Sequence, residues 1–174
     1  MAKPTFSKLK LSVNTGEKEF TWEDQVIKVK QYLSIEDKLQ LITEVLNAAA
    51  DENRFYNKGK IDLYFKLYIT YFYTNISFTD KQKEEIIKTY DALYSSGLWD
   101  CIKKAIPEEE LNYVYDLVID AVEQIYNYQN SIYGILDAIS TDYEGLNLDI
   151  QELSKKLGDK EGVKFLDQVL TKMG

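Results

Sequence analysis

The sequence contains no histidine and only one cysteine, Cys101, in 174 residues. The absence of histidine removes the commonest general base, the commonest metal ligand and the usual sensor of pH near neutrality. A lone thiol cannot form a disulfide within the chain, and without histidine it lacks the base that usually activates a cysteine nucleophile. We therefore expect Cys101 to be a buried structural residue, and we expect a protein that is not an enzyme, with no cofactor and no bound metal.

Arginine and long apolar runs are also scarce. Arg54 is the only arginine among 21 basic residues, and arginine is the side chain that binds phosphate and guanine through paired hydrogen bonds, so direct nucleic-acid binding is not expected. The longest apolar stretch, residues 63–76, contains Lys66 and Asn75 and is too short to cross a bilayer. Residues 1–10 do not resemble a secretory signal. These features predict a protein without a membrane span that stays in the cytosol where it is made.

What the chain does have is the length and composition of one globular domain. With 45% hydrophobic and 29% charged residues, it can bury a core and fold alone. We expect residues 1–6 to be a disordered start, residues 7–33 to form a β-hairpin element and residues 34–174 to form a helical bundle. The expected fold class is mainly α, a helical bundle with a small N-terminal β-hairpin element.

Two segments near the start alternate polar and apolar residues, as half-buried strands do. They are residues 8–13 and 26–33, and the turn residues of segment 14–17 lie between them. This predicted hairpin carries Lys8, Lys10, Lys18, Lys28, Lys30 and Trp22. One interpretation is a solvated, lysine-edged strand that resists aggregation. The other is a surface that pairs with the sheet edge or acidic face of another chain, with Lys28, Lys30 and Trp22 as candidate contact residues.

The apolar residues recur at helical spacing from Ser34 onwards. Ser34 with Asp37, and Thr79 with Gln82, resemble capping pairs at helix starts. The segment 61–76 is apolar on nearly every side, which favours a central helix, although its aromatic and β-branched residues leave a strand open. A further helix is expected to begin at residue 79 and to end at Gly97, and a short one to cover 98–105. A long helix is expected to begin at Pro107 and to run toward residue 140 with a bend at Gly134. Two short helices, 149–157 and 161–173, are expected to follow.

Charge is distributed unevenly along the chain. Between Lys104 and Lys155 there is no basic residue, whereas eleven acidic residues lie there. On the predicted long helix, Asp116, Asp120 and Glu123 are spaced so that they share one face. That face is either a solvated helix surface, or a docking face for a lysine-rich partner or a mimic of a nucleic-acid backbone. Its candidate contact residues are Asp116, Asp120, Glu123, Glu108, Glu109 and Tyr113.

The segment Lys30-Gln31-Tyr32-Leu33-Ser34-Ile35-Glu36-Asp37-Lys38 resembles the strand-to-helix junction of small uncharacterised proteins from bacteriophages of Gram-positive hosts. Segments 73–79, 106–110, 140–143 and 170–174 are similar to the same proteins. The resemblance implies a phage origin and a place in the virion or its assembly, and it assigns no functional residues.

These observations predict a phage structural or assembly protein that is non-enzymatic and acts through protein–protein contacts, in the host cytoplasm or in the virion. Its expected partners are other phage or host proteins, or a second copy in a homo-oligomer. The alternative is an acidic phage inhibitor of a host defence system that occupies a basic nucleic-acid-binding groove.

Overall fold

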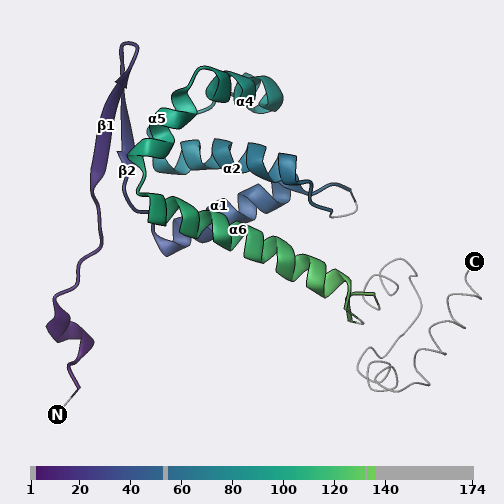
Figure 1. The fold of residues 1–174 in the computed structure, drawn as a ribbon, viewed down its shortest axis with the longest axis horizontal. Coiled ribbons are helices and arrows are strands. Elements are labelled where there is room, and N and C mark those ends of the chain that lie inside the picture. Colours follow the sequence, from purple (N-terminus) through teal and green to yellow (C-terminus); the bar gives the residue numbers. More distant parts are fainter. Residues whose placement is uncertain (1–2, 53–54, 132, 136–174) are drawn as a thin grey trace, which may run out of the picture. The chain divides into compact units, whose positions relative to one another are not determined.

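The structure is a computed structural model that describes residues 3–52, 55–131 and 133–135. Its elements are η1 (Phe6–Leu9), β1 (Glu17–Trp22), β2 (Gln25–Lys30), α1 (Ile35–Ala49), α2 (Lys58–Tyr73), α3 (Asp80–Glu84), α4 (Ile86–Ser95), α5 (Leu98–Ala105) and α6 (Glu108–Gln129) (Figure 1). This arrangement confirms the predicted fold class, mainly α with a small β-hairpin.

The chain groups into two compact units, Met1–Asp120 and Ala121–Gly174, and the expectation of one domain stays a prediction. The helices expected at 149–157 and 161–173 lie outside the described residues. In the part of the chain that is described, no helix is both long enough and apolar enough to cross a membrane.

The hairpin lies later in the chain than the sequence predicted. β1 and β2 pair in an antiparallel register that sets Phe20 opposite Ile27, and the turn between them contains Glu23 in the left-handed conformation, with φ of 51°. The predicted strand at 8–13 is wrong, because Phe6–Leu9 form a 3₁₀ turn and residues 10–16 have no regular structure. The 3₁₀ turn begins at Phe6, which is the last residue of the segment expected to be disordered. Residues 17–22 alternate as well, and their aromatic side chains are the ones that pack against the body of the protein.

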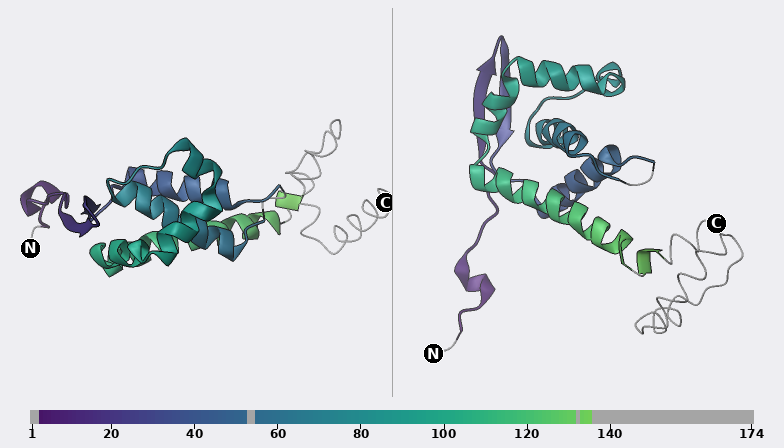
Figure 2. Two further views of the ribbon diagram at one scale, coloured as in Figure 1. Left: turned by 90° about the horizontal axis from the view of Figure 1, so that it is seen from above. Right: turned by 45° about the vertical axis from the view of Figure 1, so that its right-hand side comes forward.

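One face of the hairpin joins the hydrophobic core. Ile27 and Val29 are buried, Phe20 and Trp22 are half-buried, and β1 contacts α5. Figure 2 shows the hairpin beside α5 from a second direction. The opposite face is exposed, so the hairpin has the inward apolar and outward polar sides of a sheet covered on one side.

α1 and α2 pack side by side at the centre of the first unit. α1 begins after Ser34, whose hydroxyl accepts a hydrogen bond from the backbone N–H of Asp37 at 3.1 Å, as the capping pair predicted. α2 covers most of the segment predicted as a central helix, so the strand alternative is wrong. Its buried side chains include Phe65, Ile69 and Tyr73.

Two short helices replace the single helix expected between residues 79 and 97. Thr79 and Gln82 form the predicted capping box at the start of α3. Glu85 then leaves the helical conformation, with φ of −93° and ψ of 49°, and α4 starts at Ile86. Gly97 takes a φ of 84° and separates α4 from α5, whose bounds match the predicted ones.

α6 follows Pro107 as predicted, and Leu111, Val114 and Val118 on its apolar stripe are buried. The helix ends at Gln129, well before residue 140. A Cβ at position 134 would overlap the carbonyl oxygen of Tyr128, so the close approach of the chain there requires glycine. The interruption therefore falls just before the glycine that was expected to bend the helix.

Candidate protein-binding surfaces

The first candidate surface is the segment before the hairpin, residues 3–16, which we call the N-terminal arm. Its apolar side chains Phe6, Leu9, Leu11 and Val13 are 78%, 50%, 64% and 72% exposed. Both figures show the arm projecting away from the helices (Figures 1 and 2). Several large apolar side chains exposed together are a common sign of an interaction site. This surface was not predicted from the sequence, because the alternation of residues 8–13 indicated a strand of the hairpin.

The second candidate surface is the outer edge of β1. The outer edge of β2 is covered, since the backbone N–H of Lys28 donates to the side chain of Asn75 at 3.0 Å and the Asn75 amide donates to the carbonyl of Val26 at 3.1 Å. Thr74 forms a bridge with Val29 on the same side. Among the described residues, β1 pairs with β2 alone and no hydrogen bond reaches its other edge. An open strand edge offers backbone groups to another chain.

The predicted basic contact residues of the hairpin lie on its exposed face, opposite glutamates. Lys28 faces Glu19 across the strands with 3.2 Å between its Nζ and the carboxylate, and Lys30 faces Glu17. Residues 17–30 contain four acidic residues and three lysines. The expected lysine-rich hairpin is therefore not present. Trp22 is half-buried.

The two lysines that were misassigned to the hairpin, Lys8 and Lys10, belong to the arm. The arm also contains Lys3, and residues 1–16 contain no acidic residue. The positive charge near the N-terminus is thus concentrated on the arm.

The third candidate surface is the predicted acidic face of α6. Glu109, Tyr113, Asp116 and Asp120 share one side of the helix by their spacing, and Glu123 lies one turn further along. All five are exposed, as is Glu108. Within the described residues, none of these acidic side chains forms an ion pair. The structure therefore leaves this negative charge facing solvent.

Glu110 was counted among the eleven acidic residues between Lys104 and Lys155, and the structure shows it in a buried ion pair. Its carboxylate accepts hydrogen bonds from Lys38 Nζ at 2.9 Å, from the Tyr73 hydroxyl at 2.8 Å and from the backbone N–H of Leu33 at 3.0 Å. The Lys38 and Glu110 side chains are only 3% and 11% exposed. This buried ion pair joins α1, α2 and α6.

Two aromatic rings also lie close to the buried ammonium group of Lys38. Lys38 Nζ lies 4.1 Å from the ring centroid of Tyr32 and 5.1 Å from that of Tyr113, both favourable for a cation over an aromatic ring. Burial, together with the hydrogen bond to Glu110, raises the pKa of Tyr73 above its usual range. Tyr113, a predicted residue of the acidic face, thus also contacts the buried lysine through its ring. A sequence signal did exist, because Lys38 falls on the buried stripe of α1 with Ile42 and Val45.

A second polar cluster links α2, α4 and α5. Lys66 Nζ donates to Asp62 at 2.7 Å and to the Tyr90 hydroxyl at 3.2 Å, and that hydroxyl donates to Asp62 at 2.9 Å. The rings of Tyr94 and Trp99 lie 4.5 Å and 6.0 Å from Lys66 Nζ. Burial opposes the charged form of Lys66, but the hydrogen bonds to Asp62 and Tyr90 outweigh it and raise its pKa. A cavity of about 340 Å³ lies beside this cluster.

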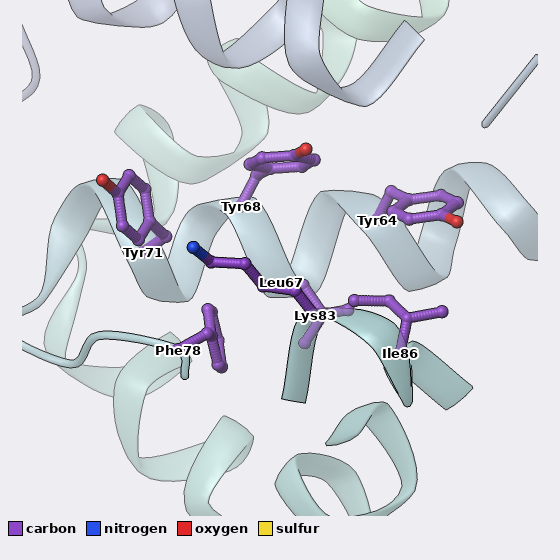
Figure 3. A pocket seen from close by; sticks show the side chains of 7 residues that line it. All are labelled: Tyr64, Leu67, Tyr68, Tyr71, Phe78, Lys83 and Ile86. Atoms are coloured by element: carbon purple, nitrogen blue, oxygen red, sulfur yellow. The ribbon is translucent and has the colours of Figure 1, made fainter. Parts of the chain in front are cut away.

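An aromatic cavity of about 300 Å³ lies between α2 and the segment that contains α3 (Figure 3). Its lining consists of Tyr64, Leu67, Tyr68, Tyr71, Phe78, Lys83 and Ile86. The lining residues of α2 follow helical spacing, so one side of that helix faces the cavity. Burial raises the pKa of Tyr68, and Lys83 is the only charged side chain in the lining. The cavity can accept an apolar group but contains no paired acid and base.

No arrangement for catalysis emerges from the described residues. Every buried polar side chain among them has a hydrogen-bond partner, and no cluster of three or more metal-binding side chains occurs in the same residues. Cys101 is half-buried, so the expectation of a buried thiol is only partly met. In three comparisons with known proteins, no family model, no curated protein and no solved structure matched this chain. The resemblance to phage proteins thus stays a prediction.

Proposed function

We propose that this protein is non-enzymatic and acts through protein–protein contacts, with the N-terminal arm as its main contact segment. The observation that carries the proposal is the exposure of Phe6, Leu9, Leu11 and Val13 within one short stretch. Each such side chain gains about 1.5–3 kcal/mol when it is fully buried. A partner that covers the arm therefore gains a substantial driving force.

The acidic face of α6 supports a second contact of opposite charge. Asp116 and Asp120 are exposed and form no ion pair within the described residues. A basic partner would neutralise them, and that contact would weaken as salt screens the charges. The protein thus offers one apolar, positively charged segment and one negatively charged helix face.

We place these contacts in a bacteriophage virion or in its assembly, with other phage proteins, host proteins or a second copy as partners. This setting is supported by the sequence resemblance alone. Mass spectrometry of purified particles of the source phage tests it. Copies in a fixed ratio to the major capsid protein would establish a virion component, and absence from the particles would leave the host cytoplasm as the site of action.

The spacing of the exposed carboxylates favours one alternative function. Asp116, Asp120 and Glu123 repeat along one helix face, as charges that imitate a nucleic-acid backbone must. The alternative is a phage inhibitor that occupies the basic groove of a host defence protein. It predicts that nucleic acid competes with the protein for its partner, whereas a structural contact through the arm is insensitive to nucleic acid.

The proposed function is tested by recovering partners on the tagged full-length protein from the cells that produce it. The informative variant is Leu9→Glu/Leu11→Glu, and its matched control is Gln40→Glu/Asn47→Glu, which adds the same charge at exposed positions of α1. We expect the wild type and the control to recover the same proteins in fixed ratio and the arm variant to lose them. Equal recovery by the arm variant would contradict the proposal.

A further inference from the structure

We infer that the arm of one copy adds as a third strand to the open edge of β1 in a second copy, and that the exchange is reciprocal. This inference rests on the proposed function, because it names the partner of the same arm. An extended segment that joins a free sheet edge is a common mode of protein recognition. Two observations carry it here, the pattern of side chains on the two segments and the backbone between them.

The side chains of the two segments match by face. In an extended arm, Leu9, Leu11 and Val13 share one side, and Lys8, Lys10 and Ser12 share the other. In β1, the half-buried Phe20 and Trp22 share the inner side with the exposed Lys18, and the exposed Glu17, Glu19 and Thr21 share the outer side. Each segment is six residues long, residues 8–13 and 17–22.

An antiparallel register that sets Leu9 opposite Phe20 also sets Lys10 opposite Glu19. Leu9 would then extend the half-buried aromatic side of the hairpin, and Lys10 would meet a glutamate of the outer side. In the same register Leu11 lies opposite Lys18, and Lys8 lies opposite Thr21. A shift by two residues loses one of the two matches, because it sets either Lys10 opposite Thr21 or Leu9 opposite Lys18. A shift by one residue would set a lysine opposite Phe20. Charge and apolar character thus favour the same register.

The backbone between the segments directs the arm away from its own β1. In the register above, folding back within one copy needs a two-residue turn at Asn14 and Thr15, and the favoured turns of this kind need a left-handed first residue. Neither residue has a positive φ, and Thr15 is β-branched. Instead, the Asn14 side chain accepts a hydrogen bond from the Gly16 N–H at 2.9 Å. The arm is therefore available to a second copy.

Little structure must be lost for the arm to become a strand. η1 is a single 3₁₀ turn with no buried residue. It is joined to Thr5 by a hydrogen bond from the Lys8 N–H to the Thr5 carbonyl at 2.9 Å and by one between the Thr5 and Ser7 hydroxyls at 3.4 Å, both in an exposed segment. Lys10 must also leave its left-handed φ of 49°, a conformation that is unfavourable for a lysine. Because each copy offers one arm and one edge, the exchange closes as a two-fold dimer.

Sedimentation velocity of the full-length protein over a range of concentrations provides the first test. We expect a dimer for the wild type and for Gln40→Glu/Asn47→Glu, and dimerisation weakened by about 100-fold or more for Leu9→Glu/Leu11→Glu. Circular dichroism checks that the variants stay folded. A wild type that is monomeric at every concentration, or a dimer that survives the arm variant, would overturn the inference.

Cross-linking then identifies the contact. In a Cys101→Ser background, one preparation carries Lys10→Cys and a differently tagged one carries Glu19→Cys, and the mixture is treated with a short bis-maleimide. We expect cross-links that join the two tags, and none when Gln40→Cys replaces Lys10→Cys. A doubly substituted chain that cross-links only within itself would show that the arm folds back on its own β1, and would overturn the exchange.

The two proposals fail in different ways. If the protein is monomeric but Leu9→Glu/Leu11→Glu still loses its captured partners, the exchange is wrong and the contact function of the arm stands. If the arm variant recovers all of the partners and still sediments as a dimer, both proposals are wrong.

Discussion

The N-terminal arm exposes apolar side chains, whereas the helical body buries charged ones. In the arm, Leu11 and Val13 face solvent, whereas in the body Lys38 and Glu110 are buried. The two buried charges pair with each other, and Glu110 also accepts hydrogen bonds from the Tyr73 hydroxyl and the Leu33 N–H. The apolar side chains of the arm, in contrast, are not covered by the described part of the chain. The contacts of the buried pair all lie within the chain, whereas the exposed apolar side chains of the arm are the basis of the proposed partner contact.

The largest expected effect is on the body. Replacing Glu110 with alanine would leave Lys38 buried without its partner, which typically costs about 3–5 kcal/mol. We expect the free energy of unfolding in urea to fall by that amount. Glu109→Ala is the matched control, because the neighbouring carboxylate is exposed, and its effect should stay within about 0.5 kcal/mol. Similar small losses for both variants would show that the pair does not hold the helices together.

Tyr73→Phe should have an intermediate effect. It removes a hydrogen bond to a carboxylate, so we expect a loss of about 1.5–3 kcal/mol at neutral pH. The raised pKa of Tyr73 also predicts a pH dependence. Its neutral hydroxyl is favoured in the folded state, so that contribution is complete below the ordinary tyrosine pKa of about 10 and is lost as the pH rises above it.

Urea unfolding between pH 8 and pH 11 measures this dependence. The wild type should lose stability above about pH 10, and Tyr73→Phe should lose less over the same interval. Lys66 has a raised pKa and acts in the same direction, so the comparison between the two proteins isolates Tyr73. Parallel curves would contradict the assignment.

Charge reversal on the acidic face should change the free energy of unfolding little and the affinity for a basic partner strongly. Asp116→Lys/Asp120→Lys/Glu123→Lys removes like charges at helical spacing, which cost only a few tenths of a kcal/mol each. We expect the free energy of unfolding to change by less than about 1 kcal/mol. Affinity for a basic partner should be lost, as measured by calorimetry at low and high salt. Unchanged affinity would mean that the face is only solvated.

The smallest expected effect on stability belongs to the arm. Leu9→Glu/Leu11→Glu should leave the thermal unfolding of the dilute protein within about 0.5 kcal/mol of wild type, because no described residue of the arm is buried. The contrast with Glu110→Ala would then separate a contact segment from a stabilising one. A large loss of stability in the dilute arm variant would mean that the arm packs on its own chain.

The sequence predicted the features that depend on neighbours along the chain. Ser34 and Thr79 cap helices and Gly97 separates two, because hydroxyl capping and positive φ are local properties. Features that depend on distant partners were missed. Residues 8–13 and 17–22 both alternate, and only packing against the helices decides which of them forms the strand. Lys38 and Glu110 lie 72 residues apart, so counting charges along the chain could not show that they form a pair.

Hydrogen–deuterium exchange of the arm tests the central claim most directly. The full-length protein is measured at low and at high concentration, with Leu9→Glu/Leu11→Glu alongside it. If the arm is a contact segment that adds to β1 of a second copy, amides in residues 8–13 and on the outer edge of β1 will gain protection together at high concentration, and the variant will show none. Rapid exchange of the wild-type arm at every concentration would contradict the account.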